Sequence, residues 1–292
     1  MKKINKCLYM ETGPTSHFDQ FGFANKDEIF YSTLAGCDGG NINAKVWTFG
    51  LEWSGNKDSL TQWQYKYYKK NLNERNEIMI PYRDEECFTL QSKVVNDYLL
   101  KNQFDNLLAN FTYGLTLINT DDKKIEDTHN FIKKTLYGKE SQIFKLNLFP
   151  LPLPEHTFHF TEYFDILGIQ LSKKEYLQKC KDNRFPLFRK LIDKYTPNVI
   201  ICFGIGEESK KFFMECLAIS KENASSPKKF NVTTPDYDAP REFIKLEYQT
   251  PSTQKIPVYI LPFLTTRFRT GWKNEVARKF AAWGHSQGWE LS

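Results

Sequence analysis

Four short apolar runs divide the chain, and each has the length of a buried β-strand. They are separated by longer stretches in which apolar residues recur at helical spacing. Short continuous apolar runs are typical of strands that are covered on both faces, as in parallel sheets. The predicted strands cover residues 45–50, 143–148, 199–203 and 258–261.

Amphipathic helices are predicted between and after these strands. Residues 92–111 place apolar side chains on one helical face, and residues 185–195 repeat this pattern. The other predicted helices cover residues 122–137, residues 204–217 and residues 271–283. Alternating strands and helices predict an α/β fold with a central, mostly parallel sheet of four to five strands, flanked by helices.

Three segments fall outside this alternation. Residues 1–44 are expected to be irregular and include the turn-rich stretch Gly36–Asn41. Residues 56–90 mix aromatic and basic side chains and are expected to form an insertion, whereas residues 220–240 have the Ser, Asn and Pro content of a surface loop. No internal repeat and no second domain is indicated, so residues 1–292 are predicted to form one domain.

The end of the first strand carries the most informative local pattern, Gly50-Leu51-Glu52-Trp53. In open α/β sheets, ligands bind beyond the carboxyl ends of the strands, where glycine allows the backbone to turn tightly. A carboxylate at that place can act on a bound ligand. The simpler interpretation is an ordinary strand exit with a solvated Glu52.

Asn147 ends the second predicted strand at the same relative depth as Glu52. An asparagine amide offers a donor and an acceptor together, so it can read the edge of a base with two hydrogen bonds. The alternative is an asparagine that caps a loop.

The segment after the last strand combines hydroxyl, guanidinium and aromatic groups: Thr265, Thr266, Arg267, Phe268 and Arg269. Such groups suit the binding of phosphates together with an aromatic wedge. A solvated basic loop is the alternative interpretation.

Composition permits a nucleic-acid partner without requiring one. The net charge is +5, and 15% of the residues are aromatic, a content that can supply stacking surfaces as well as a core. No run of eighteen apolar residues occurs, and no apolar signal-peptide core follows the lysine-rich start, so a membrane partner is not expected. The six cysteines are scattered, which is typical of reduced packing residues in a cytoplasmic protein.

Several other kinds of site are not supported by the sequence. Gly204-Ile205-Gly206 follows a strand, but Ser209 stands where a dinucleotide fingerprint needs its third glycine, so a tight strand-to-helix turn is expected. His156 and His159 have no third ligand nearby, and no Walker or GxSxG motif occurs. We therefore expect neither a metal nor an organic cofactor.

The order of these strand-end patterns resembles that of the uracil-DNA glycosylase superfamily. Gly50-Leu51-Glu52-Trp53 is similar to the family motif Gly-x-Asp-Pro or Gly-x-Asn-Pro, which places the catalytic role on Glu52. Residues 143–150 look like the family strand whose Asn contacts the base, residues 198–211 look like the strand and helix that follow, and residues 256–268 occupy the place of the His-Pro-Ser-Pro segment. The resemblance covers roughly residues 36 to 290 and implies a uracil-DNA glycosylase-like domain.

Two departures from the family pattern bear on the substrate. Trp53 replaces the usual proline, and the segment Pro262–Arg267 contains no histidine, although that histidine stabilises the departing uracil anion in the uracil enzymes. The resemblance implies a monofunctional DNA glycosylase, expected to be monomeric, that removes a modified base, for example a hypermodified cytosine of phage DNA in a defence role. A stacking role would fall to Trp53, Trp63 or Tyr65.

Two other classes of function stay open at this point. One is a non-catalytic nucleic-acid-binding protein on the same fold, and the other is a hydrolase of small molecules or nucleotides. The glycosylase prediction requires that Glu52, Asn147 and Thr265 converge within about 15 Å, the span of an ordinary ligand pocket.

Overall fold

The fold is taken from a computed structural model. It describes residues 34, 36–51, 102–115, 127–150, 172–220, 222, 228–234, 237–264 and 274–289.

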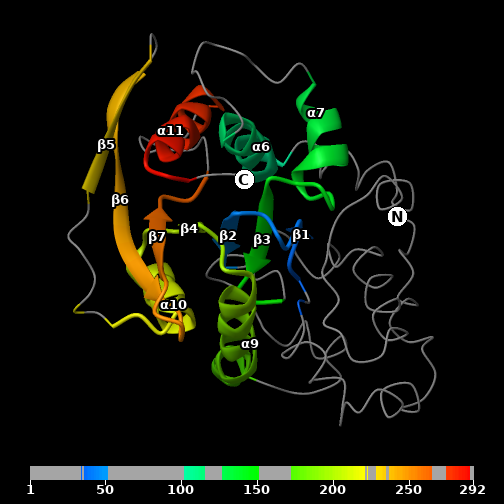
Figure 1. Ribbon diagram of the computed structural model, residues 1–292, viewed down its shortest axis with the longest axis vertical. Helices are drawn as coiled ribbons and strands as arrows, with labels where there is room; N and C mark the ends of the chain where they lie inside the picture. The colour runs from blue at the N-terminus through cyan, green and yellow to red at the C-terminus, as the bar shows by residue number, and fades with distance from the viewer. Residues whose placement is uncertain are drawn as a thin grey trace.

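The described strands form a seven-stranded mixed sheet in the order β1-β3-β2-β4-β7-β6-β5 (Figure 1). Four of them, β3, β2, β4 and β7, run parallel, and β1, β6 and β5 are antiparallel to their neighbours. The bounds are β1 Gly39–Gly40, β2 Val46–Gly50, β3 Ile143–Asn147, β4 Val199–Phe203, β5 Lys228–Thr234, β6 Tyr237–Gln249 and β7 Lys255–Leu261.

The four predicted strands are confirmed as this parallel centre, but the prediction of a four- to five-stranded sheet was incomplete. The prediction of a surface loop at residues 220–240 was wrong, because β5 and the start of β6 form an antiparallel hairpin there. An antiparallel strand with one solvated face carries polar residues at every second position, so it lacks the continuous apolar run of a doubly covered strand. The two-residue β1 likewise lies inside the segment that was expected to be irregular.

The described helices are α6 Gln103–Leu115, α7 Thr128–Phe131, the π-helix η3 Ile132–Leu136, α9 Lys173–Tyr195, α10 Glu207–Cys216 and α11 Asn274–Ser286. All five predicted helices overlap with one of these. The largest difference is α9, which begins well before residue 185. Its start is fixed by a capping box in which the Ser172 hydroxyl accepts from the Glu175 N–H and the Glu175 carboxylate accepts from the Ser172 N–H.

Helices cover both faces of the sheet. Figure 1 shows α6 and α11 on one side and α9 and α10 on the other. The side chains of β2 alternate accordingly, since Trp47 and Phe49 pack in the core under α9 and α10, whereas Val46 packs in the core under α6 and α11. Of the described helices, none is both long enough and apolar enough to span a membrane.

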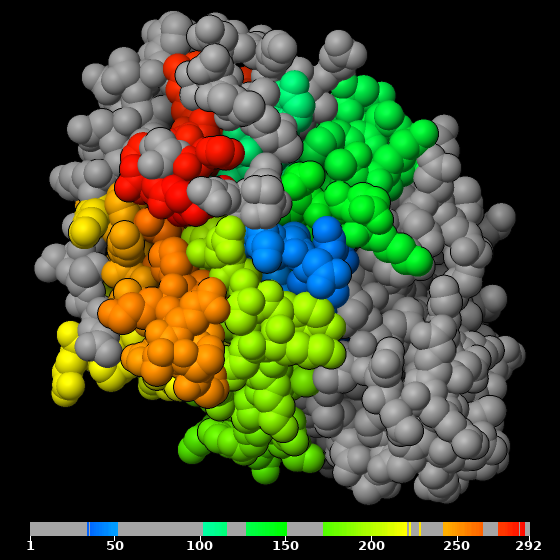
Figure 2. Space-filling model, in the orientation of Figure 1, coloured from blue at the N-terminus to red at the C-terminus, as the bar shows by residue number. Residues whose placement is uncertain are grey.

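The loop before β2 connects the amino ends of β2 and β4 by a backbone hydrogen bond. In Figure 2 the blue N-terminal segment lies between the green segment that contains β3 and the yellow-green segment that contains α9. The Lys45 carbonyl accepts a hydrogen bond of 2.8 Å from the Asn198 N–H just before β4. The carboxyl ends of β2, β3, β4 and β7 therefore gather at the opposite edge of the sheet.

The strand order contains one topological switch point. The chain leaves β2 for β3 on one side, and it leaves β4 for β7 on the other side. In open α/β sheets, ligands bind outside the carboxyl ends of the two adjacent strands at which the direction reverses. The loops after Gly50 and Phe203 therefore flank the expected ligand crevice.

Candidate functional site

The carboxyl ends of β2 and β3 are joined in register at this edge. Gly50 lies opposite Asn147, and the parallel pairing continues past both strands, since the Leu148 N–H donates to the Gly50 carbonyl at 3.0 Å and the Phe149 N–H donates to the Leu51 carbonyl at 2.7 Å. Asn147 is thus held beside the backbone that leads directly into Glu52. Asn147 and Gly50, which are far apart in the chain, are therefore neighbours at the carboxyl ends of their strands.

The Asn147 side chain is fully buried and its amide nitrogen has two partners. Nδ2 donates to the Gly36 carbonyl at 2.7 Å and to Asp38 Oδ2 at 3.2 Å. Oδ1 is buried and accepts no hydrogen bond within the described part of the chain. The sequence predicted that this amide could offer both a donor and an acceptor to a ligand. In the structure both hydrogens of the amide already have partners, so only the Oδ1 acceptor remains without one among the described residues.

A buried ion pair lies next to this amide. The Lys145 ammonium pairs with Asp38 Oδ2, and both side chains are about 5% exposed or less. The same ammonium lies over the rings of Phe104, 4.8 Å from its centroid, and Tyr137, 5.7 Å away. Asp38 Oδ2 thus accepts from both the Lys145 ammonium and the Asn147 amide nitrogen, which links the ion pair to the amide.

Sequence reasoning missed this pair, although one signal was present. Lys145 stands in the middle of an apolar run that was correctly predicted as a buried strand. Lysine is almost never fully buried without a partner, so an acidic partner was required somewhere in the fold. The periodicity could not identify that partner as Asp38, which lies in the turn-rich segment before the first strand.

Arg184 fixes the backbone of the same strand end from the other face. Its fully buried guanidinium donates to the Leu148 carbonyl at 3.0 Å, to the Asn147 carbonyl at 2.9 Å and to Cys37 Sγ at 3.5 Å. Burial raises the pKa of the Cys37 thiol, so this cysteine stays protonated and is unsuited to be a nucleophile. Cys37, Cys180, Cys202 and Cys216 are free and buried, as expected for reduced packing residues.

Gly36 allows the loop to approach this strand end closely. Its φ is +70°, and a Cβ built there would lie 2.3 Å from the Pro150 carbonyl oxygen. Any other residue would therefore combine a left-handed backbone with a backbone clash. The carbonyl that holds the Asn147 amide depends on glycine at this position.

An exposed aromatic residue lies past the end of β7. Phe263 is a large apolar side chain that is 48% exposed. Its ring stacks on Phe104 with centroids 5.2 Å apart, and Phe104 contacts Phe203 edge-on at 5.6 Å. In the sequence Phe263 stands just before the Thr/Arg-rich segment. Its stacking on Phe104, which in turn contacts Phe203, could not be predicted from the spacing of residues along the chain.

The turn at Gly204–Gly206 is a tight strand-to-helix connection, as predicted. Gly204 has a φ of +143°, and its N–H donates to the Leu261 carbonyl at 2.8 Å. The first turn of α10 carries Glu207 and Glu208. Two carboxylates at a helix N-terminus repel a phosphate, which argues against nucleotide binding at this turn.

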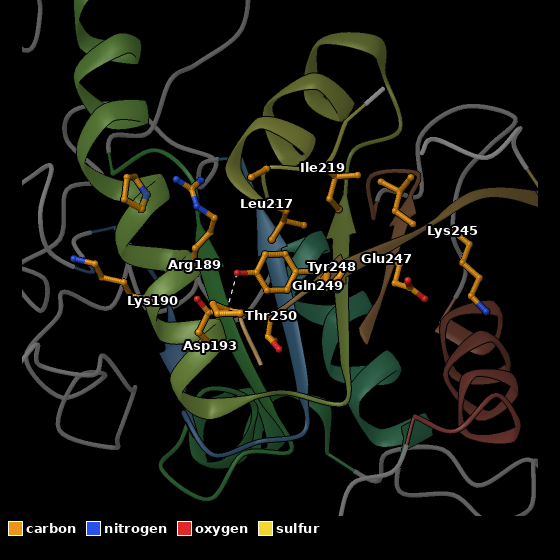
Figure 3. Close-up of a pocket in the computed structure, with 14 residues that line it drawn as sticks. Arg189, Lys190, Asp193, Leu217, Ile219, Lys245, Glu247, Tyr248, Gln249 and Thr250 are labelled. Atoms are coloured by element: carbon orange, nitrogen blue, oxygen red, sulfur yellow. Dashed lines mark hydrogen bonds between the residues drawn. The ribbon is translucent and has the colours of Figure 1, made fainter. Parts of the chain in front are cut away.

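A pocket of about 1010 Å³ lies elsewhere, between α9, the end of α10 and β6 (Figure 3). Tyr248 lines it and donates to Asp193 Oδ1 at 2.8 Å. Burial, together with this hydrogen bond, raises the pKa of Tyr248, which therefore stays neutral. Gln249 pairs with Lys255 at the start of β7, so the pocket lies at the amino end of that strand, away from Asn147.

The remaining predicted site residues lie outside the described ranges, namely Glu52, Trp53, Trp63, Tyr65, Thr265, Thr266, Arg267, Phe268 and Arg269. The convergence of Glu52, Asn147 and Thr265 is therefore a prediction that the structure does not test. His156 and His159 also lie outside. The described residues contain no group of three or more His, Cys, Asp or Glu side chains that could hold a metal ion.

The chain was compared with protein-family models, curated proteins and solved structures. No protein-family model, curated protein or solved structure matches this chain.

Proposed function

We propose that this protein is a monofunctional DNA glycosylase that flips a base out of DNA and hydrolyses its N-glycosidic bond. The observation that carries the proposal is the position of Asn147. Its buried Oδ1, which accepts no hydrogen bond from any described residue, lies at the end of β3, beside the end of β2 and next to the switch point of the sheet. Base excision requires a polar atom that reads the base and a carboxylate close to it, and we assign the second role to Glu52, which follows β2 in the sequence.

The chemistry assigned to Glu52 follows from the bond that must break. Cleavage of an N-glycosidic bond passes through an oxocarbenium-like sugar, and a carboxylate close to C1′ stabilises that cation. The same carboxylate can accept a proton from the attacking water. The base must leave the stack, which costs a few kcal/mol, and must be held by hydrogen bonds and stacking.

The other predicted residues complete the proposed site. Trp53, Trp63 or Tyr65 would stack on the flipped base, and Thr265, Thr266, Arg267 and Arg269 would bind phosphates, with Phe268 as a wedge. The missing histidine in Pro262–Arg267 favours a modified base over plain uracil. A hypermodified cytosine of phage DNA, removed in a defence role, fits these departures.

The test is a panel of DNA duplexes, each with one unusual base. The panel contains uracil, 5-hydroxymethylcytosine and glucosylated 5-hydroxymethylcytosine, and alkali-labile abasic sites are measured after incubation. We expect cleavage of at least one modified-cytosine duplex and little cleavage of the uracil duplex. Absence of abasic sites on every duplex would refute the glycosylase proposal.

Phe263 is expected to contribute to DNA binding in this scheme. A base stacked on an aromatic side chain contributes about 1–3 kcal/mol, so Phe263→Ala should weaken binding to single-stranded DNA by roughly 5- to 150-fold. Phe263→Trp keeps an aromatic face and should retain the affinity. The measurement is fluorescence anisotropy of a labelled oligonucleotide at several salt concentrations.

The salt series separates stacking from charge effects. Loss of a stacking residue lowers affinity equally at all salt concentrations, whereas loss of a phosphate contact also lowers the salt slope. Equal affinity of the Phe263→Ala and wild-type proteins would remove Phe263 from the DNA surface. Retained DNA binding without base release would instead favour the alternative, a non-catalytic nucleic-acid-binding protein.

A further inference from the structure

We propose that the groove between α9, the end of α10 and β6 binds an extended, acidic peptide segment of a partner protein, which adds a strand to a free edge of β6. The groove is the pocket of about 1010 Å³ drawn in Figure 3, called the β6 groove below. It lies at the amino end of β7, away from Asn147, and it is therefore independent of the proposed base-excision site. Pairing of an extended peptide with a sheet edge is a recurrent mode of recognition.

The second half of β6 has a described strand on one side only. β7 pairs with Ile244–Gln249, whereas β5 pairs with Tyr237–Phe243 and begins at Lys228, opposite Phe243. Since β5 and β7 lie on opposite sides of β6, no described strand continues along the β5 side beyond Phe243. The main-chain groups of such an edge can pair with another strand.

The residues that direct main-chain groups to this edge follow from the hydrogen bonds of β7. The Leu261 carbonyl accepts from the N–H of the residue after β4, so the main-chain groups of Leu261 point toward β4. This direction alternates along a strand, so Val258 points toward β6, where it pairs with Leu246. By the same alternation, the N–H and carbonyl groups of Glu247 and Gln249 point away from β7, to the free edge.

Glu247 and Gln249 both line the β6 groove, so the free edge and the groove coincide (Figure 3). The other wall is formed by Arg189 on α9 and by Leu217 and Ile219 after α10. Successive side chains of a strand point to opposite faces. A strand paired with β6 would therefore direct every second side chain toward this wall, where an acidic and an apolar group can be accommodated.

The charges of the β6 groove favour an acidic peptide. Arg189 Nη1 donates to the Cys216 carbonyl at 2.7 Å, which fixes the guanidinium at the wall, and no described carboxylate pairs with it. Both carboxylates of the lining have partners, since Asp193 accepts a hydrogen bond at 2.8 Å and Glu247 forms an exposed ion pair with Lys255 at 2.8 Å. Two lysines of the lining add positive charge. An acidic side chain beside Arg189 can form a charge-assisted hydrogen bond there.

The first test compares the charge of the peptide. Three short fluorescein-labelled peptides alternate valine with aspartate, with lysine or with serine, and fluorescence anisotropy measures their binding to the full-length protein. We expect the aspartate peptide to bind at least about tenfold more tightly than the lysine peptide, because a hydrogen bond to a charged group is worth more than a neutral one. Binding of none of the three at millimolar concentration, or a preference for lysine, would overturn the proposal.

The second test addresses the main-chain pairing. In a paired strand every second residue directs its N–H toward β6, and an N-methyl group removes that donor. The aspartate peptide is therefore methylated either at its valines or at its aspartates. We expect one set of methyl groups to weaken binding by about 5- to 150-fold, the loss of two hydrogen bonds, and the other set to leave it nearly unchanged. Equal affinities of the two methylated peptides would refute strand addition.

Arg189→Gln tests the acidic contact on the protein side. We expect the affinity for the aspartate peptide to fall about tenfold and the affinity for the serine peptide to stay the same. The matched control is Lys194→Gln, which removes one positive charge from an exposed position of the same helix outside the groove lining. An equal loss of affinity in this control would show that the overall charge, and not Arg189, selects the peptide.

These measurements contain no DNA, so their outcome is separate from that of the excision assay. Absence of peptide binding would overturn the assignment of the β6 groove and would leave the glycosylase proposal unaffected. Absence of base excision would likewise leave the peptide affinities and the effect of N-methylation to decide the role of the groove.

Discussion

The Glu52→Gln protein is expected to release base about 10²- to 10⁴-fold more slowly than the wild-type protein, with its affinity for DNA retained. This is the usual contribution of a positioned general base. Glutamine keeps the size of the side chain but carries no charge for the oxocarbenium ion and cannot take a proton from water. The loss should therefore appear in the chemical step and not in binding.

The measurement is a single-turnover excision assay with the duplex that reacts best in the panel. Enzyme is in excess over DNA, so the rate reports chemistry rather than product release. Glu275→Gln is a suitable control, because Glu275 forms a partly exposed ion pair with Lys279 one turn further along α11. An unchanged rate for Glu52→Gln would exclude Glu52 as the catalytic carboxylate, whatever the substrate.

Lys145→Met is expected to lower the free energy of unfolding by about 3–5 kcal/mol, which is the usual cost of breaking a buried ion pair on one side. The Asp38 carboxylate would lose its ammonium partner while it stays buried beside the Asn147 amide. Methionine keeps most of the length and apolar contact of the lysine stem. Denaturant unfolding monitored by circular dichroism measures the change.

The exposed pair provides the reference for this prediction. Lys255→Met breaks the pair with Glu247, and exposed pairs contribute about 0–1 kcal/mol. In the double variant Asp38→Leu with Lys145→Met, much of the stability should return, because no unpaired charge remains. A loss below about 1 kcal/mol for Lys145→Met alone would show that Asp38 is well solvated without its partner.

The parallel centre of the fold was predictable because each of its strands is a continuous apolar run. The hairpin of β5 and β6 was not predicted, because polar and apolar residues alternate along its strands instead of forming a continuous apolar run. In Ile244–Gln249 every second side chain is buried, and the residues between them are exposed. This period of two is a strand signal, but it is weaker than an unbroken apolar run, and the Pro and Asn content of residues 220–240 obscured the segment before it.

The start of α9 was missed for a different reason. Residues 173–184 are mostly charged or polar, so no apolar face identified them as helical. The capping box Ser172-x-x-Glu175 was present and marks a helix start by itself. Pro186 also lies inside this helix and would normally suggest a boundary near that position.

The candidate site was predictable in position but not in composition. Asn147 could be placed at a strand end because the strand and the sheet edge follow from local pattern. Its partners Gly36, Asp38 and Arg184 could not, since they reach it from other parts of the chain. Contacts of this kind depend on tertiary packing and leave no periodic signal in the sequence.

The hydrogen bond from the Asn147 amide to the Gly36 carbonyl joins residues 111 positions apart in the chain. Such contacts form only after long loop closures, and their entropic cost must be met before they stabilise the fold. The amide can therefore be fixed only once the segment before β2 and the end of β3 have come together. Its orientation depends on the assembled domain, because separation of the segment Gly36–Asp38 from the end of β3 would remove both partners of the amide nitrogen.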